Sequence, residues 1–127
     1  MKYFTVEEAN QLIPVISKEL EELQALQRSF AQFYDELERV KKSDNPPDDH
    51  FFQLESNLDL MEHEAQARIQ AIHSLGVELK DIYDGLVDFP AIIDDEEVLL
   101  TWRQGEPTVV YYYPSHEYEA KSRALWN

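Results

Sequence analysis

The residues best suited to chemistry lie in the C-terminal third of the chain. Carboxylates can transfer protons or hold a hard cation, and Asp81, Asp84 and Asp88 are close together in the sequence. Asp84 precedes a glycine and Asp81 follows an apolar run, so both fit turns and strand ends. Asp88 lies within the apolar segment VDFP. This predicts a buried carboxylate that needs a partner, such as Arg103 or a backbone amide.

Aromatic residues form a second group of candidates. Small-molecule sites combine aromatic walls with a few fixed polar groups, which Trp102-Arg103 and Tyr111-Tyr112-Tyr113 could supply. The same alternation is typical of a small sheet with one covered face, and the sequence favours this structural interpretation. The candidate ligand-binding residues are Asp88, Trp102, Arg103, Glu106, Tyr111, Tyr113 and His116.

Metal binding and catalysis have less support. The chain has four histidines and no cysteine, so imidazole would be the commonest metal ligand available. His50 falls in a polar linker, while His63 and His73 lie outside the apolar columns, which predicts a solvated face. His116 could meet Asp88 only in the folded protein. The phosphate-loop, dinucleotide-binding, HExxH and GxSxG motifs are all missing from the sequence, so we expect no catalytic residue, metal or cofactor.

Composition narrows the class of partner. The 127 residues include 26 acidic and 11 basic side chains, and the net charge of -15 disfavours nucleic acid and anionic membranes. Seven Tyr, six Phe and two Trp indicate a folded domain rather than a disordered acidic chain. The N-terminal segment does not have the apolar core of a signal peptide, and no apolar run reaches the length of a membrane span. We therefore expect a cytoplasmic protein.

The sequence predicts two helices before the candidate site residues. Thr5-Val6-Glu7-Glu8 is a capping box, and the apolar residues of 9–40 recur in three helical columns, wider than a simple coiled-coil seam. Pro14 predicts a kink rather than an end. The stretch 41–49 predicts a linker, and a narrower apolar pattern over 51–75 ends at Gly76.

The register of the two helices predicts an antiparallel hairpin. Folding about the linker places Leu37 near residues 54 and 55, Tyr34 near Leu58, and Leu20 near Ile72. The narrower second helix should leave part of the first uncovered, which favours a homodimer through helix one. The predicted interface residues are Leu26, Phe30, Phe33, Leu37 and Val40.

The apolar spacing changes to that of strands after residue 76. Runs at 77–79, 86–89, 98–102 and 109–113 are separated by Asp84-Gly85, Asp94-Asp95 and Gln104-Gly105, which predicts an antiparallel meander. Residues 117–126 fit a short helix or an irregular tail. The expected fold is a single α+β domain over residues 1–127, with a long helical hairpin over about 5–76 and a small sheet and tail over about 77–127.

Three segments of the chain resemble a known family. The sequences FTVEEANQLIP, GVELKDIYDGLVDFP and VLLTWRQGEP are similar to signatures of domain-of-unknown-function family 2203, small bacterial and archaeal proteins. The resemblance covers nearly the whole chain and implies this fold and no activity. Members often place a His directly after an aromatic pair in the last strand. Here Tyr113 follows that pair and His116 is displaced, so no metal role is carried over.

These observations favour a non-enzymatic cytoplasmic interaction or scaffold protein that self-associates through its helical hairpin. The alternative is a small-ligand or metal-binding protein, or an enzyme, with a site around Asp88, Arg103, Glu106 and His116. An open polar pocket at the sheet would favour the alternative. A continuous apolar helix face occupied by another subunit would favour the interaction protein.

Overall fold

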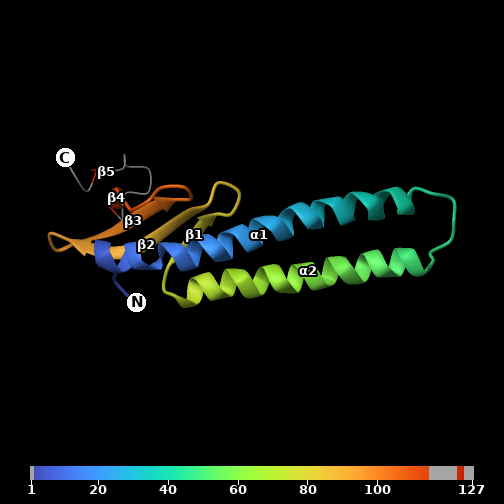
Figure 1. Ribbon diagram of the computed structural model, residues 1–127, viewed down its shortest axis with the longest axis horizontal. Helices are drawn as coiled ribbons and strands as arrows, with labels where there is room; N and C mark the ends of the chain where they lie inside the picture. The colour runs from blue at the N-terminus through green and yellow to red at the C-terminus, as the bar shows by residue number, and fades with distance from the viewer. Residues whose placement is uncertain (1, 115–122, 125–127) are drawn as a thin grey trace.

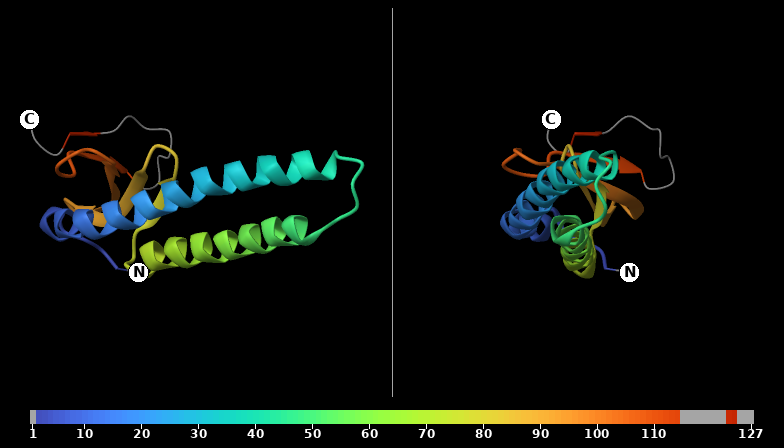
Figure 2. Two further views of the ribbon diagram at one scale, coloured as in Figure 1. Left: turned by 45° about the vertical axis from the view of Figure 1, so that its right-hand side comes forward. Right: turned by 90° about the vertical axis from the view of Figure 1, so that its right-hand side faces the viewer.

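A computed structural model of the chain describes residues 2–114 and the backbone of residues 123–124. Two helices form a long hairpin, and a five-stranded antiparallel sheet lies against the N-terminal half of the first helix (Figures 1 and 2). The elements are α1 (Val6–Lys41), α2 (Asp49–Ser74), β1 (Glu78–Asp81), β2 (Leu86–Ile93), β3 (Glu96–Arg103), β4 (Tyr111–Pro114) and β5 (Arg123–Ala124). The predicted α+β fold, a helical hairpin followed by a meander, is confirmed.

The helix α1 begins at the predicted capping box. The Thr5 hydroxyl accepts a hydrogen bond from the Glu8 amide at 3.0 Å, and the Glu8 carboxylate accepts one from the Thr5 amide at 3.0 Å. The helix continues through Pro14, which is exposed, and reaches Lys41. One missing backbone hydrogen bond therefore does not end a helix whose opposite face is buried. The buried residues of this half are Ala9, Ile13, Ile16, Leu20 and Leu23.

The helix α2 begins after the predicted linker and ends at the predicted glycine. The Asp48 carboxylate caps its first turn by accepting a hydrogen bond from the Phe51 amide at 3.0 Å. Gly76 follows the helix with a φ of +90°, a left-handed conformation that favours glycine. His50 lies in the first turn of α2 rather than in the linker.

The two helices pack in the predicted antiparallel register. Leu20 and Ile72 share the main core, and Leu37 forms a distal cluster with Leu54 and Leu58. Tyr34, which was expected near Leu58, is 48% exposed. It stacks on the ring of Phe30 along the same helix, with 6.2 Å between the ring centroids.

An ion pair explains why a charge interrupts the apolar pattern of α2. The Arg68 guanidinium lies 2.8 Å from a Glu22 carboxylate oxygen and 3.3 Å from one of Glu19. All three side chains are at least partly accessible, so these pairs contribute little stability. They do connect α1 and α2 between the main core and the distal cluster.

Leu37, one of the five predicted interface residues, belongs to the distal cluster. Leu37 is only 5% exposed and is buried within the chain, so it has no free surface for a second subunit. The first helix was expected to have a surplus apolar face, but the first turns of α2 cover much of it. The partly buried residues around the cluster are Phe30, Phe33, Val40 and Phe51.

The strands form the predicted meander, with boundaries shifted by a few residues. Asp94 and Asp95 have φ values of 51° and 64°, as in a two-residue hairpin turn of type I′. This turn sets the register of β2 and β3, so that Ile93 pairs with Glu96 and Asp88 pairs with Thr101. β2 extends past its predicted end to Ile93. The predicted 117–126 segment lies largely outside the described residues, and β5 is its one described element.

The two faces of the sheet have different environments. The helices lie on one side of it in all views (Figures 1 and 2). The face toward α1 carries the buried residues Val87, Phe89, Ala91, Val98, Leu100 and Trp102. Since side chains alternate along a strand, their neighbours Asp88, Thr101 and Arg103 belong to the outer face. Within the described part of the chain, no helix has the length and apolar character to cross a membrane.

Candidate functional site

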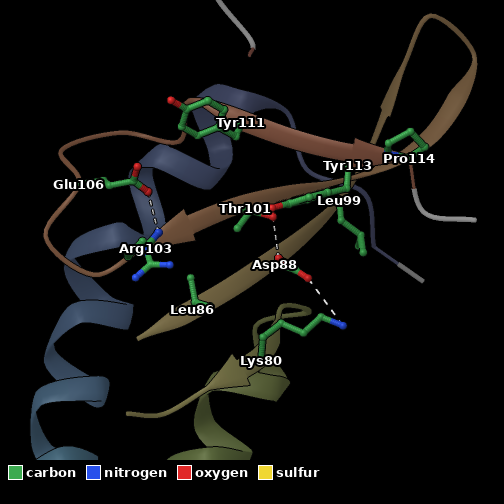
Figure 3. A pocket seen from close by; sticks show the side chains of 10 residues that line it. All are labelled: Lys80, Leu86, Asp88, Leu99, Thr101, Arg103, Glu106, Tyr111, Tyr113 and Pro114. Carbon is green, nitrogen blue, oxygen red and sulfur yellow. Dashed lines mark hydrogen bonds and ion pairs between the residues drawn. The ribbon is translucent and has the colours of Figure 1, made fainter. Parts of the chain in front are cut away.

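The outer face of the sheet contains a cavity of about 440 Å³ (Figure 3). Its floor comes from three adjacent strands. Asp88 of β2 pairs with Thr101 of β3, which pairs with Tyr111 of β4, so these side chains form one row across the sheet. The ten lining residues are Lys80, Leu86, Asp88, Leu99, Thr101, Arg103, Glu106, Tyr111, Tyr113 and Pro114.

Asp88 lies at the centre of this cavity and is 5% exposed. The Thr101 hydroxyl donates a hydrogen bond to its Oδ1 at 2.8 Å, and the Lys80 ammonium lies 3.7 Å from its Oδ2 (Figure 3). Burial raises the pKa of the Asp88 carboxyl, and the Thr101 hydrogen bond and the Lys80 charge offset part of this increase. The prediction of a buried, partnered carboxylate is confirmed.

The predicted partner of Asp88 was wrong. Arg103 lies two pairs further along, opposite Leu86, while Thr101 is directly across from Asp88. Lys80 reaches the carboxylate from β1, where the pairing with β2 is irregular between Leu79 and Asp81. The partners are therefore set by strand register rather than by the charge of nearby residues.

The raised pKa of Asp88 predicts a pH-dependent effect of Asp88→Asn. Between the ordinary carboxyl pKa of 3.8 and the raised folded value, the folded protein holds a proton that the unfolded chain releases. The wild type therefore loses stability as pH rises through this window, and the uncharged Asn does not. We expect the melting temperature of Asp88→Asn to rise relative to wild type between pH 3.5 and 7. Parallel profiles for the two proteins would contradict this assignment.

The turn after β3 fixes Arg103 and Glu106 at one end of the cavity. The Glu106 Oε1 accepts a hydrogen bond from the Arg103 amide at 2.7 Å, and the Glu106 amide donates to the Arg103 carbonyl at 3.0 Å. The Arg103 side chain is exposed at the edge of the cavity. Among residues 2–114, no carboxylate forms an ion pair with its guanidinium.

The same end of the sheet is attached to α1. The Gln24 side-chain amide donates to the Ile82 carbonyl at 3.0 Å and to the Gln104 side-chain oxygen at 2.6 Å. Gly85 has a φ of +69°, and a Cβ there would lie 2.5 Å from the Cβ of Gln104. Only glycine therefore lets the two turns pack this closely. These contacts hold the end of β3 that carries Arg103.

Trp102 does not line the cavity. It is 1% exposed in the main core, and its indole N–H donates to the Glu106 carbonyl at 2.8 Å. The alternation of side chains places Trp102 and Arg103 on opposite faces, so both cannot belong to one pocket wall. Trp102 therefore contributes to the site indirectly, through its hydrogen bond to the turn that contains Glu106.

The structure brings together five of the predicted ligand-binding residues, namely Asp88, Arg103, Glu106, Tyr111 and Tyr113. His116 lies outside the described residues. The sequence reasoning missed Lys80, Leu86, Leu99, Thr101 and Pro114. The two-residue turn at Asp94-Asp95 was a signal for Thr101, because it sets the strand register. The irregular pairing that directs Lys80 into the cavity has no signal in the sequence.

The described histidines do not contribute to this site. His50, His63 and His73 are exposed on α2, as the spacing predicted for the last two. No cluster of three potential His, Cys, Asp or Glu metal ligands occurs in the part of the chain that the structure describes. The cavity thus offers two carboxylates, two cations, hydroxyls and apolar walls, a combination that can orient a small organic molecule.

A family model described as "Uncharacterized conserved protein (DUF2203)" matches residues 2–123, which include both helices and β1 to β4. No curated protein and no solved structure matches the chain.

Proposed function

The chain belongs to the DUF2203 family, and we propose that it binds a small molecule in the cavity on the outer face of its sheet. The observation that carries this proposal is the gathering of Asp88, Arg103, Glu106, Tyr111 and Tyr113 around one cavity. They come from three strands and one turn. The family description names no activity, and the support for binding comes from the site itself.

The buried carboxylate supports a binding role. Placing Asp88 in a half-apolar cavity costs stability, and the raised pKa of its carboxyl reflects that cost. A leucine or threonine at this position would fit the same strand with a smaller loss of folding stability than a buried carboxylate. Buried groups with perturbed pKa values are concentrated at functional sites. We infer that Asp88 is present to make a hydrogen bond with a ligand.

The cavity has the size and composition of a small-ligand site. Its volume of about 440 Å³ lies in the range typical of such pockets, roughly 300–1,000 Å³. Leu86, Leu99 and Pro114 supply apolar surface, and Tyr111 and Tyr113 supply aromatic rings on the same side of β4. Thr101 and Lys80 hold Asp88 in place, so the polar group is already oriented.

Native mass spectrometry of the protein purified from its own host, without added metal, tests this proposal. We expect a fraction of the protein to carry a small organic molecule, which leaves on denaturation. The same preparation, emptied and then mixed with a small-molecule extract of the host, should regain that mass. Protein that carries no such molecule and takes none from the extract would contradict the proposal.

Self-association through the hairpin is a second proposal, supported by a different hollow. A groove of about 1010 Å³ lies between the helices near the sheet, and its apolar lining includes Leu26 and Phe30 of α1 and Met61 and Ala65 of α2. A second copy packing there would use Leu26 and Phe30 without Leu37. The same native spectra count subunits, and only monomers at all concentrations would contradict this proposal.

A further inference from the structure

We propose that the ligand of the sheet cavity is a small organic acid whose carboxylate binds Arg103 and whose hydroxyl or amino group donates a hydrogen bond to Asp88. This inference rests on the proposed function of the cavity and specifies the class of molecule that it takes. Three observations support it: the distribution of charge, the lack of an ion pair between Arg103 and a carboxylate of residues 2–114, and the spacing of Asp88 and Arg103.

The distribution of charge singles out this cavity. The segment 77–114 contains nine acidic residues and two basic ones, Lys80 and Arg103. Both basic residues line the cavity. In a chain with a net charge of -15, most of the surface repels anions, so a cavity that sets two cations beside its two carboxylates, Asp88 and Glu106, is a local exception. An anionic ligand fits this exception better than a neutral or cationic one.

Arg103 is the better anion anchor of the two cations. The Lys80 ammonium lies 3.7 Å from Asp88 and 3.6 Å from Glu78, so acidic neighbours already balance its charge. The Arg103 guanidinium has no ion pair with a carboxylate in residues 2–114. Guanidinium binds a carboxylate through two parallel hydrogen bonds, which gives both affinity and orientation.

The spacing of Asp88 and Arg103 sets the shape of the ligand. Thr101 pairs with Asp88, and Arg103 is two residues further along the same strand, on the same face. Such diagonal neighbours are about 7–8 Å apart in an antiparallel sheet. A molecule that meets both side chains therefore needs an acid group and a hydrogen-bond donor separated by a few bonds. The rings of Tyr111 and Tyr113 and the side chain of Leu99 would contact its body.

A charge-sorted fragment screen by ligand-observed NMR tests this inference. The library holds matched sets of small carboxylic acids, their neutral amides and their amine analogues, each with and without a hydroxyl group. We expect hydroxy and amino acids to bind the wild type most tightly. Arg103→Gln should weaken the acids about tenfold or more, the loss expected for a charge-assisted hydrogen-bonded pair. The neutral amides should change little.

Arg39→Gln is the matched control, since it removes the same charge from an exposed position on α1 far from the sheet. It should leave all affinities unchanged. Acids that bind no better than amides or amines, or that bind Arg103→Gln as well as wild type, would overturn the inference while leaving small-molecule binding intact. A library in which no fragment of any charge binds the cavity would instead overturn the proposed function.

Discussion

Replacing Trp102 with Ala is expected to lower the free energy of unfolding by about 3–5 kcal/mol, the largest stability effect of any single truncation in the sheet. Trp102 is 1% exposed and packs in the core between β3 and the helices. Its truncation leaves a large void, and the Glu106 carbonyl loses the indole donor that now lies 2.8 Å away. Urea unfolding followed by circular dichroism measures the change.

Tyr111→Ala is the matched control on the opposite face of the sheet. Tyr111 is 44% exposed, so its truncation should cost well under half as much as that of Trp102. Equal losses for the two variants would mean that the outer face contributes as much to stability as the buried face toward α1. The assignment of the outer face as a binding surface would then be wrong.

Filling the cavity with Leu99→Trp is expected to abolish ligand binding with little loss of stability. Leu99 lines the cavity and is only half-buried, so a larger ring can extend into open space instead of the packed core. Ile92→Trp places the same ring on the outer face of β2, at a position 51% exposed and outside the cavity lining. Calorimetry with the best acid from the fragment screen should show binding to Ile92→Trp and none to Leu99→Trp. Comparable affinities would place the ligand elsewhere.

Much of the fold follows from local chemistry in the sequence. The Thr5 capping box, the linker prolines and the left-handed Gly76 each act over a few residues, so their effects can be deduced without a structure. The two-residue turn at Asp94-Asp95 is of the same kind and sets the pairing of β2 and β3. Asp88 was recognised because a carboxylate within an apolar strand segment must be buried with a partner.

The features that were missed depend on long-range geometry. The sequence gives no measure of how far the first turns of α2 reach across α1, so Leu37 was assigned to an interface although it is buried within the chain. Trp102 was grouped with Arg103 because they are adjacent, although the pleat separates them. Lys80 enters the cavity where the pairing of β1 with β2 is irregular, and no pattern of residue types in the sequence predicts this irregularity.

The structure also changes the balance between the two functions that the sequence allowed. The sequence favours the interaction protein because helix one has a wide apolar face, but Leu37 of that face is buried and Phe30, Phe33 and Val40 are partly buried. The ligand-binding alternative needed Asp88, Arg103 and Glu106 to lie near one another, and the three line one cavity. We therefore place small-molecule binding first and self-association second.

Chemical-shift mapping of ¹⁵N-labelled protein with the best-binding acid tests most directly whether the outer face of the sheet is the functional site. The account predicts that the largest changes fall on the amides of Asp88, Thr101, Arg103 and Tyr111, and that Leu99→Trp shows none of them. Changes that cluster instead along the groove of Leu26, or a spectrum that stays unchanged with every acid, would contradict it.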